Sequence, residues 1–114
     1  MEYMLMIYVN EAGWPQLSKA QQEQGMAAYL AYTEALQKAG VLKKSGRLHP
    51  STSAATVRAA GGTTNVLDGP YADAKEQLGG FYIIDVPDRE AAIAWAKRCP
   101  GAGHGIVEVR QVRT

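Results

Sequence analysis

The sequence has few of the residues that build metal centres and disulfide frameworks. Its 114 residues include one cysteine and two histidines. A single cysteine excludes a disulfide within the chain and is typical of a reducing compartment. These residues are also too few for a tetrahedral zinc site built by one chain. The chain shows no cofactor-binding motif either, so we expect neither a metal nor another cofactor.

Strong charge of one sign is also missing, because 12 Lys and Arg residues oppose 11 Asp and Glu residues and leave a net charge of +1. A near-neutral chain has no electrostatic footprint for nucleic acid or for an anionic membrane. The apolar run at residues 3–9 is much shorter than the roughly 20 residues of a membrane-spanning helix. Glu2 stands where a signal peptide needs positive charge. We therefore expect a cytoplasmic protein without nucleic-acid or membrane partners.

The composition that remains is that of one globular domain, with 46% hydrophobic and 20% charged residues. Residues 3–9 (YMLMIYV) predict a β-strand whose two faces are both apolar. Such a strand is typical of the centre of a sheet that is covered on both sides. In a chain this short, its own helices can cover one face. We expect a second subunit, in a homodimer, to cover the other.

Two helices are predicted. Residues 18–39 open with the capping-box pattern Ser18-Lys19-Ala20-Gln21 and stop at Gly40. The apolar face expected to enter the core from this helix consists of Met26, Tyr29, Leu30, Thr33 and Leu36. A second helix over residues 89–99 follows Asp88 as N-cap. Its expected core face consists of Ala92, Trp95, Ala96 and Cys99. Pro100-Gly101 should end it, leaving His104 in a loop.

The other segments predict strands. Residues 54–60 and 63–68 flank Gly61-Gly62, which is a signal for a tight β-hairpin. Gly79-Gly80 inside a strand pattern indicates a bulge or a close backbone approach. The remaining strands are expected at residues 41–47, 78–86 and 105–112. This order predicts an α+β fold: ferredoxin-like βαββαβ with an extra β-hairpin.

The most specific motif is the tetrapeptide DGPY at residues 68–71, followed by ADAKEQLGGFYIIDVP at residues 72–87. With a tyrosine in place of phenylalanine in the tetrapeptide, the chain resembles the YCII-related family, in the group that carries a DGPF motif. Further matching segments are residues 3–8, 94–96, 99–100 and 107–110. The resemblance implies one domain over residues 1–114. It also implies a dimeric α+β barrel, in which two ferredoxin-like protomers face each other across a two-fold axis.

The resemblance implies two possible functions. One class of relatives is similar to a dehydrochlorinase of chlorinated hydroxyhydroquinones, for which a His–Asp pair is the proposed active centre. This favours a cofactor-independent enzyme that performs acid/base chemistry, elimination or isomerisation, on a small phenolic or enolisable molecule. The alternative is a non-catalytic ligand-binding or regulatory module, linked to an extracytoplasmic-function sigma factor. Many relatives carry a histidine in the first helix where this chain has Gly25, which favours the alternative.

Asp68 and His49 are the candidate catalytic residues. Asp68 serves either as a general base at the mouth of a pocket or as a turn residue bonded to the backbone two residues on. His49 either shuttles protons, in place of the missing helix histidine, or is a polar residue at the end of a strand.

Four aromatic residues are candidates for a ligand pocket: Tyr8, Tyr29, Tyr71 and Phe81. Aromatic rings, some with one polar end, suit a small aromatic or apolar ligand. The alternative is that these rings pack in the core and between subunits.

Overall fold

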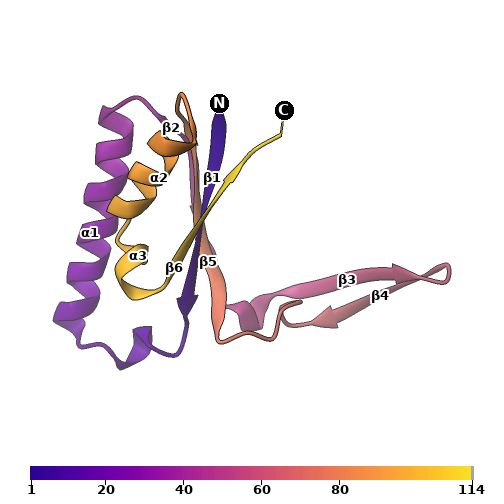
Figure 1. The fold of residues 1–114 in the computed structure, drawn as a ribbon. Helices are drawn as coiled ribbons and strands as arrows, with labels where there is room; N and C mark the ends of the chain where they lie inside the picture. The colour runs from indigo at the N-terminus through magenta and orange to yellow at the C-terminus, as the bar shows by residue number, and fades with distance from the viewer. Residues whose placement is uncertain (114) are drawn as a thin grey trace.

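The computed structural model describes residues 1–113 and shows a four-stranded antiparallel sheet with helices on one face (Figure 1). The strands are β1 (Glu2–Asn10), β2 (Leu42–Arg47), β3 (Ala55–Ala60), β4 (Thr63–Asp68), β5 (Glu76–Asp85) and β6 (Ile106–Gln111). The helices are α1 (Lys19–Lys38), α2 (Arg89–Arg98) and α3 (Gly101–His104), with short 3-10 turns η1 (Trp14–Gln16) and η2 (Ser51–Ser53).

The order of strands in the sheet is β2-β5-β1-β6, and β3 and β4 pair only with each other. This is the predicted α+β fold: a ferredoxin-like arrangement with a β-hairpin inserted between β2 and β5. One element was not predicted. The segment after Pro100 continues as α3 rather than as a loop, because the Ala102 and Gly103 amides donate to the carbonyls of Cys99 and Pro100.

The predicted helix signals are confirmed. The Ser18 hydroxyl accepts from the Gln21 amide at 3.1 Å, and the Gln21 side chain accepts from the Ser18 amide at 2.9 Å. At the other end of α1, Gly40 has a φ of +72°, which few other residues adopt at low cost. The Asp88 carboxylate accepts from the Ala91 amide at 2.9 Å and begins α2. Both helices are therefore delimited by short-range interactions.

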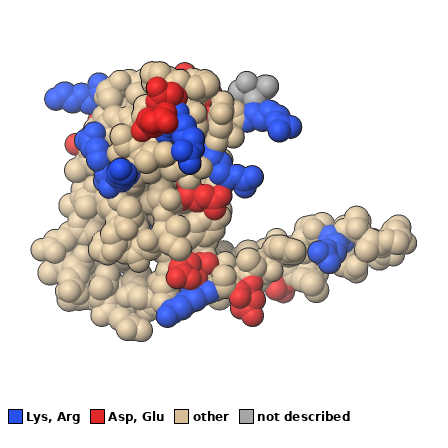
Figure 2. Space-filling view, in the orientation of Figure 1, with Lys and Arg blue, Asp and Glu red and all other residues tan. Residues whose placement is uncertain are grey.

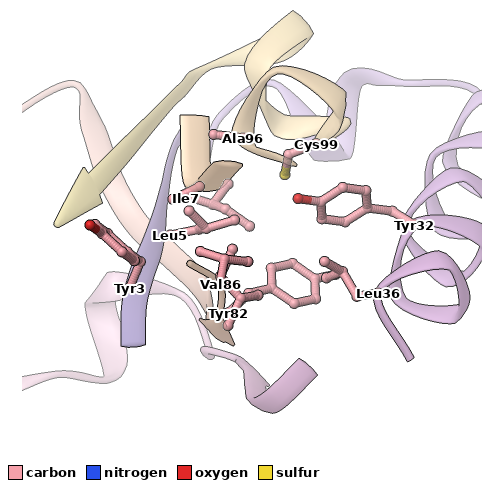
Figure 3. Packing of buried hydrophobic residues seen from close by; sticks show 11 residues of the cluster. Tyr3, Leu5, Ile7, Tyr32, Leu36, Tyr82, Val86, Ala96 and Cys99 are labelled. Carbon is pink, nitrogen blue, oxygen red and sulfur yellow. The ribbon is translucent and has the colours of Figure 1, made fainter. Parts of the chain in front are cut away.

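The hydrophobic core lies between the sheet and the helices (Figure 3). The Tyr32 ring packs edge-on against Tyr82, with ring centroids 5.3 Å apart, and its hydroxyl donates to the Trp95 carbonyl at 2.7 Å. A buried phenol thus keeps a hydrogen-bond partner while its ring fills the core. The buried residues are Tyr3, Leu5, Ile7, Tyr32, Leu36, Tyr82, Ile84, Val86, Ala92, Ala96 and Cys99.

The predicted core face of α1 was wrong in part. Met26 and Leu30 are 54% and 62% exposed, while Tyr32 and Leu36 are buried. Two neighbouring apolar stripes run along α1, one with Met26 and Leu30 and the other with Tyr32 and Leu36. The spacing of apolar residues alone does not separate them. The stripe that carries Tyr32 faces the sheet, since its ring and its hydroxyl both find partners there.

The helices cover only one face of the sheet within a single chain (Figure 1). Tyr3, Leu5 and Ile7 of β1 are buried beneath them, whereas Met4, Met6 and Tyr8 on the opposite face are only half-buried. Met4 pairs with Ile83 and Met6 with Phe81 on β5. We call Met4, Met6, Tyr8, Phe81 and Ile83 the open face of the sheet.

The hairpin of β3 and β4, residues 55–68, extends away from the body as an arm (Figure 1). Its turn is at Gly61 and Gly62, whose φ angles of +57° and +81° confirm the predicted tight turn. The arm leaves the end of the sheet that lies away from the chain termini, and it projects on the side opposite the helices. We call that end of the sheet the arm end.

The predicted bulge is also confirmed. Ile7 pairs with Gly80 and Tyr8 with Leu78, so that Gly79 is the extra residue on β5. A Cβ atom on Gly80 would lie 2.9 Å from the Gly46 carbonyl oxygen of β2. The glycine pair therefore allows both the bulge and the close approach of β2. Among residues 1–113, no helix has both the length and the apolar character that crossing a membrane requires.

We predict that Leu36→Ala lowers the free energy of unfolding by about 2–5 kcal/mol, because it empties a fully buried position. Leu30→Ala is the matched control and should change it by less than about 0.5 kcal/mol. Urea unfolding followed by circular dichroism measures both values. Equal losses would contradict the orientation of α1.

Candidate functional site

The base of the arm holds two of the predicted site residues, Asp68 and Tyr71. Asp68 ends β4 and is followed by Gly69, whose φ is +106°. The turn is closed by the backbone, since the Gly69 amide donates to the Ala54 carbonyl at 2.6 Å. Pro70 has no N–H for the Asp68 carboxylate to accept from. The turn therefore leaves that carboxylate available at the surface.

A shallow hollow of about 440 Å³ lies along the arm next to this turn. Arg58, Asn65, Leu67, Asp68 and Tyr71 are among the residues that line it. Leu67 and Tyr71 are 67% and 80% exposed, so that the hollow is open to solvent in a single chain. Sequence reasoning missed Arg58, whose place directly opposite Asn65 in the hairpin was the available signal.

His49 and Tyr8 lie at the arm end of the sheet. His49 follows β2 directly after Leu48, whose amide donates to the Gly79 carbonyl at 2.9 Å, and its side chain is exposed. Tyr8 lies near the end of β1, on the open face, with its hydroxyl 4.0 Å from the Met6 sulfur. Neither residue lines the hollow on the arm. The arm end and the base of the arm thus carry a carboxylate, an imidazole and two phenols on connected segments, and of these Asp68 and Tyr71 share the hollow.

The segment after His49 is held in place by an acidic residue from the other side of the arm end. The Ser51 amide donates to the Glu11 carboxylate at 2.7 Å, and the Ser51 hydroxyl donates to the other oxygen of the same group. Glu11 belongs to the loop after β1, whereas Ser51 begins η2. These two hydrogen bonds tie the end of β1 to the connection that leads into the arm.

Tyr29 lies on the helix side of the sheet, away from Tyr8 and Phe81. Burial raises the pKa of Tyr29 to about 12, and Cys99 and Tyr82 contribute in the same direction, while Arg47 opposes them. Tyr29 is therefore a neutral phenol at neutral pH. The structure does not bring it together with the rings of the open face, because the sheet separates them.

Gly25 lies one helical turn before Tyr29, where the Trp14 ring covers it. A Cβ atom at Gly25 would lie 3.3 Å from Trp14 Cζ3, and the Arg47 guanidinium carbon lies 5.7 Å from the centroid of the same ring. Trp14 belongs to η1, and its carbonyl accepts from the Gln22 side chain at 3.0 Å. The glycine allows the indole to pack directly on α1, and a histidine there would require the indole to move.

Phe81 lies in the middle of the open face. Its ring covers Gly46 of β2, where a Cβ atom would approach Phe81 Cε1 to 2.7 Å. Phe81 and Tyr8 thus share a face of the sheet, whereas Tyr71 is on the arm. The four predicted pocket residues do not line one cavity within the part of the chain that the structure describes.

Within residues 1–113, no group of three or more His, Cys, Asp or Glu side chains is placed to hold a metal ion. Cys99 is buried, and burial raises the pKa of its thiol. A second shallow hollow of about 490 Å³ lies between α2 and β6, where Arg89, Ile93, Lys97 and Val109 contribute to its walls. Its lining residues include no Asp, Glu, His, Cys or Tyr.

Residues 1–114 match the model of the YCII-related domain. The chain belongs to the YCII-related family. An uncharacterized protein of Rhizobium meliloti (strain 1021) is 38% identical to it over 112 residues, which are 96% of this chain and 90% of the relative. The match therefore covers nearly the whole length of both chains.

The fold also matches a solved structure. This is 5-chloro-2-hydroxyhydroquinone dehydrochlorinase from Burkholderia phenoliruptrix AC1100, in complex with 2,5-dihydroxybenzoquinone. The TM-score is 0.57 with 18% sequence identity, and the match covers 99% of this chain and 94% of the other. At that identity the likeness shows a shared fold between this YCII-related chain and the enzyme.

We predict that Gly25→Ala and Trp14→Ala are coupled. Alanine is favoured over glycine inside a helix by about 1 kcal/mol. The full gain should appear in a Trp14→Ala background, and a smaller gain with Trp14 present, because the new methyl group crowds the ring. Urea unfolding measures both. Gln24→Ala, at the neighbouring exposed position, is the control and should have the same effect in both backgrounds. Equal gains for Gly25→Ala would contradict the packing of Trp14.

Proposed function

We propose that this protein is a cofactor-independent enzyme that performs acid/base chemistry, an elimination or isomerisation, on a small phenolic or enolisable molecule. The proposal is supported by the presence of Asp68 and Tyr71 in the hollow at the base of the arm, with His49 and Tyr8 on neighbouring segments at the arm end of the sheet. Such chemistry needs a base, an acid and aromatic surface for a flat ligand. The fold match to a dehydrochlorinase in complex with a dihydroxybenzoquinone is consistent with that ligand class.

The proposed roles follow from the chemistry of each group. The Asp68 carboxylate takes a proton from the ligand as general base, because its turn does not use it. In an elimination, the electrons of the broken C–H or O–H bond form the new double bond while the bond to the departing group breaks. That group leaves with its electron pair and takes a proton from His49. Tyr71 and Tyr8 provide aromatic surface, and Arg58 beside the hollow balances the charge of a phenolate. Phe81 extends the same apolar surface, whereas Tyr29 contributes to packing across the sheet.

We also propose that the functional unit is a homodimer joined through the open face, in the manner of a dimeric α+β barrel. The centre of that face is apolar, with Met6 beside Phe81. The outer strands add charge at its margins: Lys44 pairs with Ile83, and Glu108 pairs with Met6. An apolar centre with a charged rim is the usual anatomy of a protein interface. Both signs of charge are present, so that two identical faces can be complementary.

A specific observation supports the alternative proposal of a non-catalytic binding or regulatory module. The place where many DGPF-type relatives carry a histidine is Gly25 here, and the Trp14 ring fills the space beside it. In this reading the chain keeps the ligand-binding surfaces of its group without an acid/base residue in α1. A regulatory partner, such as an extracytoplasmic-function sigma factor, then receives the signal of the bound ligand.

We predict that phenols or enolisable acids raise the melting temperature in a thermal-shift screen. A ligand at 100 times its Kd stabilises the folded state by about 2.7 kcal/mol. With a ligand that is turned over, Asp68→Asn and His49→Ala should each lower kcat by about 100-fold or more. Asp73→Asn and His104→Ala are the matched controls and should leave kcat unchanged. Full turnover by the first pair contradicts the assigned roles. Binding without turnover favours the regulatory module.

We predict that the chain sediments as a dimer at micromolar concentration and that Met6→Lys makes it monomeric, because a charge would be buried at the centre of the interface. Met26→Lys, the same change on the exposed face of α1, should leave the dimer intact. Sedimentation velocity measures all three proteins. A monomeric unsubstituted chain contradicts the proposed homodimer.

A further inference from the structure

The arm exposes apolar side chains for which its own chain provides no cover. Val57 and Val66 are directly opposite each other in the hairpin, and each is 63% exposed. Ala55 and Ala59 lie on the same side, because strand residues two apart share a face. Thr64 and Asp68, the direct partners of Ala59 and Ala55, share this side. We call the side of the arm that carries Ala55, Val57, Ala59 and Val66 the valine face. The opposite face carries Thr56, Arg58, Asn65 and Leu67.

A hairpin of two strands is at best marginally stable in water, and it needs a third strand or a packing partner to be ordered. Strands β3 and β4 pair only with each other. The bond from the Thr56 hydroxyl to the Gly69 carbonyl at 2.8 Å closes the base of the hairpin and does not join it to the body. The distal part of the arm therefore needs a surface that the single chain does not provide.

The dimensions of the chain show how much surface remains uncovered. Its radius of gyration is 16.0 Å, whereas a compact domain of 114 residues has about 13 Å. Its accessible area is 8042 Å², against about 6,100 Å² for a compact monomer of 12.3 kDa. The excess of about 1,900 Å² is more than the roughly 800 Å² that each partner buries in a standard interface. One interface of ordinary size thus fits within this excess.

We infer that the valine face of each arm packs against a second copy of this chain, and that the site at the arm base is complete only in that dimer. The inference rests on the homodimer proposed above and adds a second contact to it. The body and the arm form an L whose open corner lies on the side of the open face (Figure 2). Any copy that covers the open face enters this corner and meets the arm. In a dimer with a two-fold axis, each arm then contacts the opposite chain, and the two contacts are identical.

Charge is compatible with this occupant. The visible surface of the arm is mostly uncharged (Figure 2). Arg58 and Asp68 are the charged residues of segment 55–68, and their charges cancel. A second copy with a net charge of +1 is therefore not repelled. Asp68 is the direct partner of Ala55 and therefore lies on the valine side of the arm, where the second copy would cover it. The hollow beside Arg58, Asn65 and Leu67 lies mainly on the other side.

Photo-crosslinking from single positions tests the inference without needing a substrate. A benzophenone amino acid placed at Val66 should crosslink two chains of the purified protein, and mass spectrometry then locates the acceptor residues. The same residue at Leu30, which is equally exposed on α1, is the matched control and should give no crosslinked dimer. Val57→Thr with Val66→Thr keeps the shape and the strand preference of the arm but makes it polar. It should weaken the dimer at least tenfold by sedimentation, whereas Leu30→Gln should not.

A further variant keeps the test independent of side-chain effects. Replacing residues 56–67 by Gly-Gly joins Ala55 to Asp68, which are direct partners in the hairpin. It should retain the circular dichroism of the body and weaken the dimer at least tenfold. An unsubstituted dimer that shows no crosslink from Val66 and no weakening in either arm variant overturns the inference and leaves the homodimer standing. A monomeric unsubstituted chain overturns both, and crosslinks from Leu30 place the interface on the helices and overturn the arm contact.

Discussion

Strand β1 is the constraint on which the rest of the structure depends. It is an inner strand of the sheet and pairs with β5 on one side and with β6 on the other, so that the first strand of the chain lies between two strands from its second half. Its odd-numbered side chains form the floor beneath the helices, and its even-numbered ones form the middle of the open face. A slip of one residue would exchange the two sets. The bulge at Gly79, near the start of β5, shifts the pairing between β5 and β1 by one residue, while β1 stays in register with β6.

The sequence was informative where structure is determined by neighbouring residues. The capping box at Ser18, the N-cap at Asp88 and the Gly61-Gly62 turn each involve contacts over a few positions, and each was predicted correctly. The core face of α1 depends instead on which ring finds a partner across the sheet. The periodicity of apolar residues does not show whether Leu30 or Tyr32 is buried. The partners of Tyr32 decide this, and they are the Tyr82 ring and the Trp95 carbonyl, which are distant in sequence.

The candidate site was harder to predict for the same reason. Composition identified the aromatic and titratable residues, and strand alternation correctly suggests that Tyr8 belongs with Met4 and Met6. It cannot show that Tyr29 is on the other side of the sheet, or that the segment with Asp68 projects from the body. Likewise, a glycine in the middle of a helix indicates close packing, but only the fold shows that the neighbour is Trp14.

The buried Cys99 makes local opening of this protein measurable. Its thiol lies among the residues of the core, beside Gly101, and burial raises its pKa, so that the folded protein presents almost no reactive thiolate. A thiol reagent can reach it only when α2 separates from the sheet. The rate at which a thiol reagent labels the native protein therefore reports how often Cys99 becomes accessible, with no introduced probe. Cys99 is thus a natural probe for the opening of the layer between the helices and the sheet.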